Sequence, residues 1–447
     1  MAACSPRDRR RHKDWDEGQH RSPAERDHDR IIYTGALQRL ASVTQVAGGG
    51  EGLVFHNRLT HTLKVAQIAR RLAEKLGGEQ VRAADALGGV DPSVAEAAAL
   101  AHDLGHPPFG HIAEEELDSL ARAHNAPEGF EGNAQTFRIL TRLATHRSEY
   151  AGLDLTRATL NGVLKYPWLR DTRQKGADPK KAKKFGAYSS EIDDFNFARE
   201  GYGSSDRQSP EAAIMDHADA IAYSVHDLDD FYRAGLIPLE SLVSSDEEWL
   251  WFANRWKAVG AKVPEETIDT SREEFRDLIT RVTAGAHYSG TRKERAVLRG
   301  ATSSLIDQFV RGVRLREPDE GGDGALVIQD SWNDLAVRFL QALVWVYVIK
   351  NPRLATQQYG QRQIVRFLFS TYLSAVMRRE LDFVPALFRS EVEELGGSNC
   401  SGDRQPIEQE TRIAIDIVAH FTDSQAVLLY RRLTGAAPGS VVEMLHG

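Results

Sequence analysis

Long segments of this chain repeat apolar residues at helical spacing, and this periodicity constrains the fold class more than any other feature. The clearest of these segments span residues 57–77, 91–105 and 209–231. Two of them open with an N-capping residue followed by proline, at Asp91 and Ser209, which is the usual start of an α-helix. We expect the first segment to end at Gly77 and the second at Gly105. The chain is therefore predicted to be mainly α-helical.

Strand signals are few, and the best of them lies in the C-terminal half. The stretch "VRLREPDEGGDGALVIQD" places two β-prone runs around a glycine-rich turn, which predicts a small hairpin. Residues 335–350 form the most apolar run, but Arg338 and Gln341 interrupt it and it is too short to span a bilayer. We expect a buried helix there and no membrane partner.

The composition narrows the class of protein. The net charge is −8, so the whole molecule has no bulk attraction for nucleic acid. Cys4 and Cys400 are the two cysteines of the chain, which excludes a disulfide framework and a zinc–thiolate site. No apolar run of signal-peptide length lies near the N-terminus, so a cytoplasmic protein is expected.

A basic stretch stands out at residues 170–184, "RDTRQKGADPKKAKK", with seven basic and two acidic residues. It reads either as a solvated surface loop or as a loop that bends over or steers an anionic ligand. The sequence leaves both readings open.

The stretch "AHDLGHPPFGH" concentrates candidate chemistry in eleven residues. His102 and Asp103 side by side suit a divalent metal, but one such pair is weak evidence in a chain of this length. His61 offers a further imidazole from another helix, on the same face as Arg58. The helix after Pro210 adds an acid–phenol–acid stripe, which a hydrated helix face would also explain; its members are Asp219, Tyr223 and Asp227.

The order H…HD…D on separate helices resembles the ligand set of HD-domain metal phosphohydrolases. The wording of "HNRLTHTLKVAQIARRLA", "AHDLGHPPFGHIAEEEL", "GFEGNAQTFRIL" and "DHADAIAYSVHDLDDF" is similar to that of deoxyguanosinetriphosphate triphosphohydrolase-like proteins. The segments "LKYPW" and "KFGAYSSEIDDFNFAR" also resemble this family. The similarity runs from about residue 26 to 230 and continues more loosely through the C-terminal half.

The resemblance implies a mainly α fold with an HD-domain core. We expect three regions: a charged, flexible tail at 1–28, the core at 29–240, and a helical region at 241–447 that completes the active site and the oligomer contacts. One divalent metal ion is implied. Mg²⁺ or Mn²⁺ suits the carboxylates best, while Fe, Co or Zn would also bind the imidazoles. The implied ligands are His61, His102, Asp103 and Asp219.

The resemblance also implies roles for other residues. His111 and Glu114 match a catalytic pair near the scissile P–O bond, while His106 is either a second-layer residue or a substrate contact. The implied substrate contacts are Gln45, Arg58, Lys165, Tyr166, Tyr223 and Asp227. Of these, Arg58 would grip the α-phosphate, and Tyr223 would leave no space for a 2′-hydroxyl.

The implied reaction is dNTP + H₂O → deoxynucleoside + tripolyphosphate, in a homo-oligomer of tetramer or hexamer type with a dNTP effector as a second ligand. The base preference stays open. One alternative is an HD-family phosphohydrolase that acts on another nucleotide. The other is a dNTP-sensing or single-strand nucleic-acid-binding protein, for which the basic segments would give weak nucleic-acid binding. No Gly-Lys dipeptide occurs, which excludes a P-loop nucleotidase.

Overall fold

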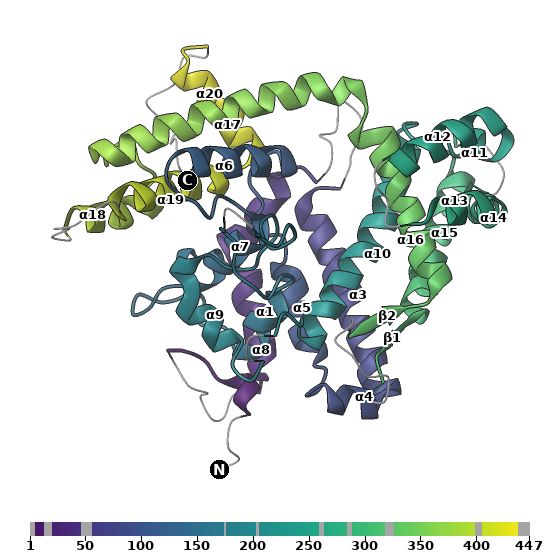
Figure 1. Cartoon of the computed structure of the whole chain (residues 1–447), viewed down its shortest axis with the longest axis horizontal. Coiled ribbons are helices and arrows are strands. Elements are labelled where there is room, and N and C mark those ends of the chain that lie inside the picture. Colours follow the sequence, from purple (N-terminus) through teal and green to yellow (C-terminus); the bar gives the residue numbers. More distant parts are fainter. Residues whose placement is uncertain are drawn as a thin grey trace.

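A computed structural model of the chain describes residues 5–12, 20–45, 56–173, 176–202, 205–258, 263–283, 288–317, 326–397 and 405–436. Within these residues the protein consists of 20 α-helices, several short 3₁₀ and π segments, and one two-stranded antiparallel sheet (Figure 1). The prediction of a mainly α fold is confirmed.

The centre of the molecule is formed by α3 (Arg58–Glu79), α5 (Pro92–Ala101) and α10 (Pro210–Arg233), which pack against one another. The predicted helix starts are confirmed. The Asp91 side chain accepts hydrogen bonds from the first turn of α5, and the Ser209 side chain caps α10. The buried apolar faces of these three helices belong to one continuous core. This core holds fixed the helices that carry the predicted metal ligands.

Two predicted helix ends were wrong. α3 continues through Gly77 and ends at Glu79, with Gln80 as its C-cap. An interior glycine costs a helix only about 1 kcal/mol, and the buried face of α3 outweighs that cost. α5 ends at Ala101 with His102 as its C-cap, so residues 102–105 form a turn beyond the helix.

The helices around this centre are mostly short. On the N-terminal side they are α1 (Pro23–Ile32), α2 (Gly35–Arg39), α4 (Val81–Ala86), α6 (His111–Ala123), α7 (Gly132–Arg138), α8 (Arg157–Val163) and α9 (Ile192–Ala198). The short 3₁₀ and π segments are η1 (Pro6–Asp8), η2 (Leu40–Ser42), η3 (Ile139–Leu143), η4 (Ser189–Glu191), η6 (Trp345–Ile349) and η7 (Ala386–Phe388).

The C-terminal half forms two groups of helices, which lie on the right and along the top of Figure 1. The first group is α11 (Leu239–Ser244), α12 (Asp246–Ala258), α13 (Glu265–Thr270), α14 (Arg272–Thr283), α15 (Arg292–Arg311) and α16 (Ser331–Val344). The second is α17 (Pro352–Arg378), α18 (Arg389–Gly397), α19 (Gln405–His420) and α20 (Asp423–Leu433). The second group shares an apolar cluster with α6, so the helix that begins at His111 is supported from the C-terminal side.

The predicted hairpin is confirmed, since β1 (Val313–Leu315) pairs antiparallel with β2 (Val327–Gln329). The buried helix expected at 335–350 is also present, as α16 and η6. No helix among the described residues is long and apolar enough to cross a membrane.

Part of the tail that its charge led us to expect to be flexible is packed. Residues 5–12 lie on the core, with η1 against α8, while residues 1–4 and 13–19 of the tail lie outside the described residues. Arg10 is buried and pairs with Asp27 at 2.6 Å, while Arg7 donates to the Gly88 carbonyl at 2.7 Å. The arginines of this segment thus find carboxylate and carbonyl acceptors on the core, which orders the chain despite its polar composition.

Candidate active site

Three of the predicted metal ligands meet at the end of α5. Donor atoms of His61, His102 and Asp103 all lie within 4.8 Å of one another, and all three residues are buried. Asp219 joins them from α10, because its Oδ1 lies 3.1 Å from His61 Nε2 and 3.8 Å from His102 Nε2. The four residues are therefore one cluster, brought together from α3, the end of α5 and α10.

The orientation of His102 fits a metal ligand. Its Nδ1 lies 2.7 Å from the Ala99 carbonyl oxygen, so Nδ1 carries the proton and donates it to that acceptor. Its Nε2 is buried, has no hydrogen-bond partner among the described residues and lies 3.4 Å from Asp103 Oδ1. A metal-binding imidazole usually donates a hydrogen bond from one ring nitrogen, which fixes the ring and leaves the lone pair of the other nitrogen free for the metal. His102 has this arrangement.

Both carboxyls of the cluster are ionised. Burial opposes ionisation of Asp103, but the His102 and His106 imidazoles and the Arg58 guanidinium hold its pKa well below the usual range. Burial likewise opposes ionisation of Asp219, whose pKa the Lys165 ammonium and the His61 imidazole keep far below its ordinary value. Two carboxylates beside two imidazoles form a donor set that suits a divalent cation.

Arg58 and His106 form a second layer around Asp103. Arg58 Nη1 donates to Asp103 Oδ2 at 2.7 Å, and its side chain is fully enclosed. His106 Nδ1 lies 3.0 Å from Asp103 Oδ1. Burial and the Arg58 guanidinium lower the pKa of His106. In this arrangement Arg58 holds the carboxylate that the sequence assigned to the metal.

The proline pair after His106 turns the chain back toward the cluster. Phe109 and Gly110 both have positive φ, at 64° and 61°, and such strain in a non-glycine residue is concentrated at functional sites. The Phe109 N–H donates to Asp423 Oδ1 at 2.8 Å, at the first residue of α20. Thr44 N–H donates to Oδ2 of the same carboxylate at 3.1 Å. The C-terminal helices thus fix the turn.

His111 is the first residue of α6 and pairs with Glu114 one turn later. His111 Nδ1 lies 2.8 Å from Glu114 Oε2. The His111 side chain is 70% exposed, whereas that of Glu114 is 9% exposed. One ring nitrogen is oriented by a buried carboxylate while the rest of the ring faces solvent, which is the geometry of an acid–base imidazole.

The residues expected around the sugar lie further along α10. Asp227 is buried, and its Oδ2 has no hydrogen-bond partner among the described residues. Burial and the neighbouring Asp230 and Asp219 carboxyls raise its pKa well above the ordinary value, which favours the protonated form. Tyr223, one turn before it, is half-buried. Gln45 lies beside the turn, with its backbone oxygen close to Gly110; its side-chain oxygen is buried and has no hydrogen-bond partner within the part of the chain that the structure describes.

Lys165 and Tyr166 have different surroundings although they are adjacent. Lys165 Nζ lies 3.0 Å from Asp219 Oδ2 and 2.8 Å from Asp216 Oδ1, so it contacts the metal cluster directly. Tyr166 packs against Trp168, with ring centroids 5.7 Å apart. The structure thus joins Lys165 to the cluster, whereas Tyr166 packs with aromatic residues.

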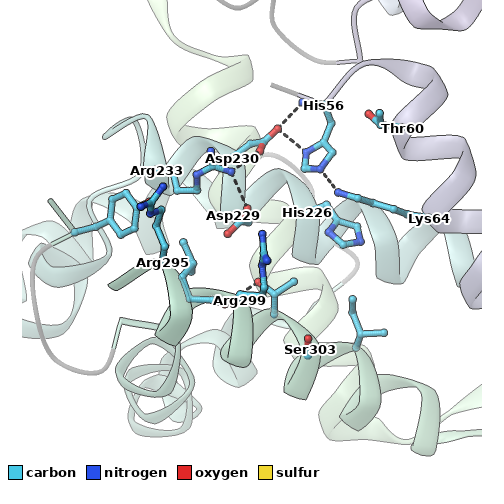
Figure 2. Close-up of a pocket in the computed structure, with 14 residues that line it drawn as sticks. His56, Thr60, Lys64, His226, Asp229, Asp230, Arg233, Arg295, Arg299 and Ser303 are labelled. Atoms are coloured by element: carbon cyan, nitrogen blue, oxygen red, sulfur yellow. Dashed lines mark hydrogen bonds and ion pairs between the residues drawn. The ribbon is translucent and has the colours of Figure 1, made fainter. Parts of the chain in front are cut away.

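A cavity of about 640 Å³ opens beside the cluster, between α3, α10 and α15. Figure 2 shows His56 between Asp230 and Lys64, with Arg299 facing them from α15. His56 Nδ1 lies 2.5 Å from Asp230 Oδ2. On α10 the cavity is lined by His226, Asp229, Asp230 and Arg233, the residues around Asp227 and the turn after it.

Most residues of this cavity were not predicted from the sequence. His56, Lys64, His226 and Asp230 line it, and none of them was singled out. A local signal did exist, because His226 and Asp230 continue the polar stripe of α10. Arg295 and Arg299 of α15 are exposed and also line the cavity.

Comparison with known proteins matches both halves of the chain. The HD domain model matches residues 58–224, and the phosphohydrolase-associated domain model matches residues 333–432. A deoxyguanosinetriphosphate triphosphohydrolase-like protein of Streptomyces coelicolor is 36% identical over 434 residues, which cover 93% of each chain. The chain belongs to this family.

Other members agree with that placement. The family member of Corynebacterium efficiens is 35% identical, over 93% of this chain and 92% of its own. That of Bifidobacterium longum is 33% identical, over 92% and 82%. The HD match covers α3, α5 and most of α10, which carry the cluster. The protein is thus an HD-domain hydrolase, and HD domains bind divalent metals.

Proposed function

We propose that the protein hydrolyses deoxynucleoside triphosphates to a deoxynucleoside and tripolyphosphate. The observation that carries this proposal is the buried cluster of His61, His102, Asp103 and Asp219. His106 pairs with Asp103 and its ring centroid lies 5.6 Å from that of His111, which joins the His111–Glu114 pair to the cluster. Tyr223 and Asp227 follow Asp219 on α10 at one-turn spacing. Together with membership of the family, these groups support a metal site, an acid–base pair and a sugar contact for such a substrate.

The proposed ligands of the single divalent ion are His61, His102, Asp103 and Asp219. The unpaired, buried Nε2 of His102 supports this assignment. When bound, the ion supplies Lewis-acid polarisation of the α-phosphoryl group. Mg²⁺ or Mn²⁺ is our first choice because half of the donors are carboxylates.

The chain's own residues position the substrate and move one proton. Water oxygen forms a bond to the α-phosphorus, and the bond from that phosphorus to O5′ breaks with its electron pair on O5′. In our proposal His111 Nε2 gives its proton to O5′ while Glu114 holds Nδ1. Lys165 and Tyr166 contact the phosphates, and the water's proton passes to solvent. Arg58 keeps Asp103 oriented and reaches the α-phosphate with its remaining donors.

The nucleoside end extends along α10 in this proposal. The protonated Asp227 carboxyl bonds the 3′-hydroxyl, and the Tyr223 ring packs where a 2′-hydroxyl would stand. Gln45 closes the other side of the sugar. The base enters the cavity next to Asp230. The volume of this cavity lies in the range of small-molecule sites.

We also propose that the protein assembles as a tetramer or hexamer and that a dNTP acts as effector. The resemblance to the family supports both statements. Light scattering after gel filtration, with and without each dNTP, tests both statements. A monomer under every condition would refute the proposed oligomer.

The activity test is a panel of the four dNTPs, singly and in pairs, with Mg²⁺ or Mn²⁺ and with chromatographic separation of deoxynucleosides from nucleotides. We expect deoxynucleoside and tripolyphosphate from the native chain. The Asp219→Asn variant is the matched control and should produce neither. No turnover with any pair would favour the sensor or nucleic-acid-binding reading.

A further inference from the structure

The basic segment at residues 170–184 has no part in the reaction proposed above, yet its last residue reaches the catalytic pair. Lys184 Nζ lies 2.9 Å from Glu114 Oε1 and 2.8 Å from Glu131 Oε1. The other oxygen of Glu114 holds His111 Nδ1 at 2.8 Å. A single ammonium group thus connects two carboxylates, one of which orients the exposed imidazole.

The backbone around Lys184 is held in place from several sides. The indole N–H of Trp168 donates to the Lys184 carbonyl at 2.7 Å, and Gly186 N–H donates to the Trp168 carbonyl at 2.9 Å. A Cβ atom at Gly186 would lie 2.2 Å from the Tyr166 carbonyl oxygen, so the segments around Gly186 and Tyr166 are in close backbone contact. Lys180 stacks over the Trp168 ring at 4.7 Å. These contacts place Lys184 and explain why the basic stretch is anchored at this end.

The two carboxyls need this cation. Glu114 and Glu131 are 7% and 1% exposed, and two neighbouring buried carboxyls cannot both ionise without compensation. Burial opposes ionisation of Glu114, but the His111 hydrogen bond and the Lys184 charge hold its pKa well below the usual range. Burial raises the pKa of Glu131, with Lys184 opposing the rise. The His106 imidazole also lowers the pKa of Glu114.

We propose that Lys184 is a positioning residue: it keeps Glu114 available as an ionised acceptor for His111 by offsetting the negative charge that Glu114 and Glu131 bring together. Lys184 acts through Glu114 and does not touch the reacting atoms. This role rests on the proposed triphosphohydrolase function for its kinetic test, although its electrostatic test does not.

The sign of the effect follows from the geometry. Glu114 has a depressed pKa, so the pair is intact above that pKa and is lost as the pH falls through it. Removing the ammonium raises the pKa of Glu114 by about 1 unit. The acid limb of the kcat–pH profile should therefore move up by the same amount in Lys184→Met, with a small change in kcat near pH 8. Lys184→Arg should restore the native limb.

A compensating substitution separates this role from a merely structural one. In Lys184→Met, adding Glu131→Gln removes the second carboxylate that repels Glu114, so the acid limb should move back toward the native position. Lys183→Met is the matched control, because Lys183 is exposed and next in sequence; its kcat profile should be native. Additive loss in the double variant would overturn the proposal, as would a higher KM in Lys184→Met with an unchanged kcat–pH profile.

The second readout needs no substrate. The Glu114 carboxyl carbon, assigned by its absence in Glu114→Gln, is titrated by ¹³C NMR in the native chain and in Lys184→Met. We expect its midpoint to rise by about 1 unit in the variant. An unchanged midpoint refutes the positioning role. A native chain inactive on every dNTP would refute the proposed function instead, and the NMR shift would still decide the role of Lys184.

Discussion

The two ends of the polar stripe on α10 carry the same residue type with pKa values shifted in opposite directions. At one end, Asp219 lies between Lys165 Nζ at 3.0 Å and His61 Nε2 at 3.1 Å, and its carboxyl is ionised. Two turns later, Asp227 has a buried oxygen with no hydrogen-bond partner among the described residues, and burial and the Asp230 carboxyl raise its pKa. The pKa of each acid is set by the groups on the helices that face it. The position of the two acids in one stripe does not determine which of them is ionised.

This contrast assigns different work to the two ends. An ionised carboxylate beside imidazoles attracts a cation, whereas a protonated carboxyl donates and accepts hydrogen bonds with a neutral hydroxyl. We therefore interpret the first end as the metal end and the second as the sugar end of one site.

The largest effect is expected at the metal end. Asp219→Asn removes a charged ligand without changing the shape of the side chain, and several kcal/mol of charge stabilisation correspond to a fall in kcat of roughly 10⁴-fold. Metal content after dialysis, measured by mass spectrometry, should fall with the rate. Native metal content together with native kcat would end the distinction between the two ends.

The catalytic pair should behave differently from the metal end. His111→Gln is expected to lower kcat by about 10³-fold, because it removes the proton donor, while the bound metal stays at the native level. The same dialysed samples provide the measurement. Loss of metal in this variant would place His111 among the ligands and merge two groups that we keep apart.

The sugar end should affect recognition more than the metal. Asp227→Ala removes one hydrogen bond to the 3′-hydroxyl, worth about 2 kcal/mol or roughly 30-fold in kcat/KM. A 2′,3′-dideoxynucleotide lacks that hydroxyl, so its kcat/KM should be nearly equal in the native chain and the variant. An equal loss with both substrates would mean that Asp227 does not bond the sugar.

The smallest effect concerns stability next to the cavity. Burial raises the pKa of Asp230 to about 6, against the Arg233 and Lys64 charges. Between about pH 4 and 6 the folded state keeps a proton on Asp230 that the unfolded state has released. As the pH rises through the folded pKa, ionising this buried carboxyl destabilises the fold. The native chain should lose about 1 kcal/mol of unfolding free energy between pH 5 and 7.5 that Asp230→Asn does not lose. Urea unfolding at the two pH values measures this; identical differences at both would show that Asp230 titrates normally.

Local signals predicted much of the fold. The caps at Asp91 and Ser209 and the hairpin at β1–β2 were found because each depends on neighbouring residues. The predicted end of α3 at Gly77 was wrong, because the packing that stabilises the helix beyond Gly77 comes from distant parts of the chain. The turn at residues 102–105 depends on such contacts as well, because Gly105 lies directly against the backbone of α7.

The sequence predicted those parts of the candidate site whose residues lie close together in a motif. It did not predict the parts that depend on contacts between residues far apart in the sequence. His102, Asp103 and His111 stand within ten residues of sequence, and the resemblance to the family added His61 and Asp219. Lys184 lies 70 residues from Glu114, and no periodicity connects them. The cavity around Asp230 is likewise formed by α3, α10 and α15, which only the folded chain brings together.

The central claim is that water attacks the α-phosphorus and that the bond to O5′ breaks. The most direct test is turnover of a dNTP in ¹⁸O-enriched water with Mg²⁺ or Mn²⁺, followed by ³¹P NMR of the products. Our account predicts tripolyphosphate with one ¹⁸O on a terminal phosphorus, and an unlabelled deoxynucleoside. Pyrophosphate with a labelled nucleoside monophosphate, or label in the deoxynucleoside, would contradict it.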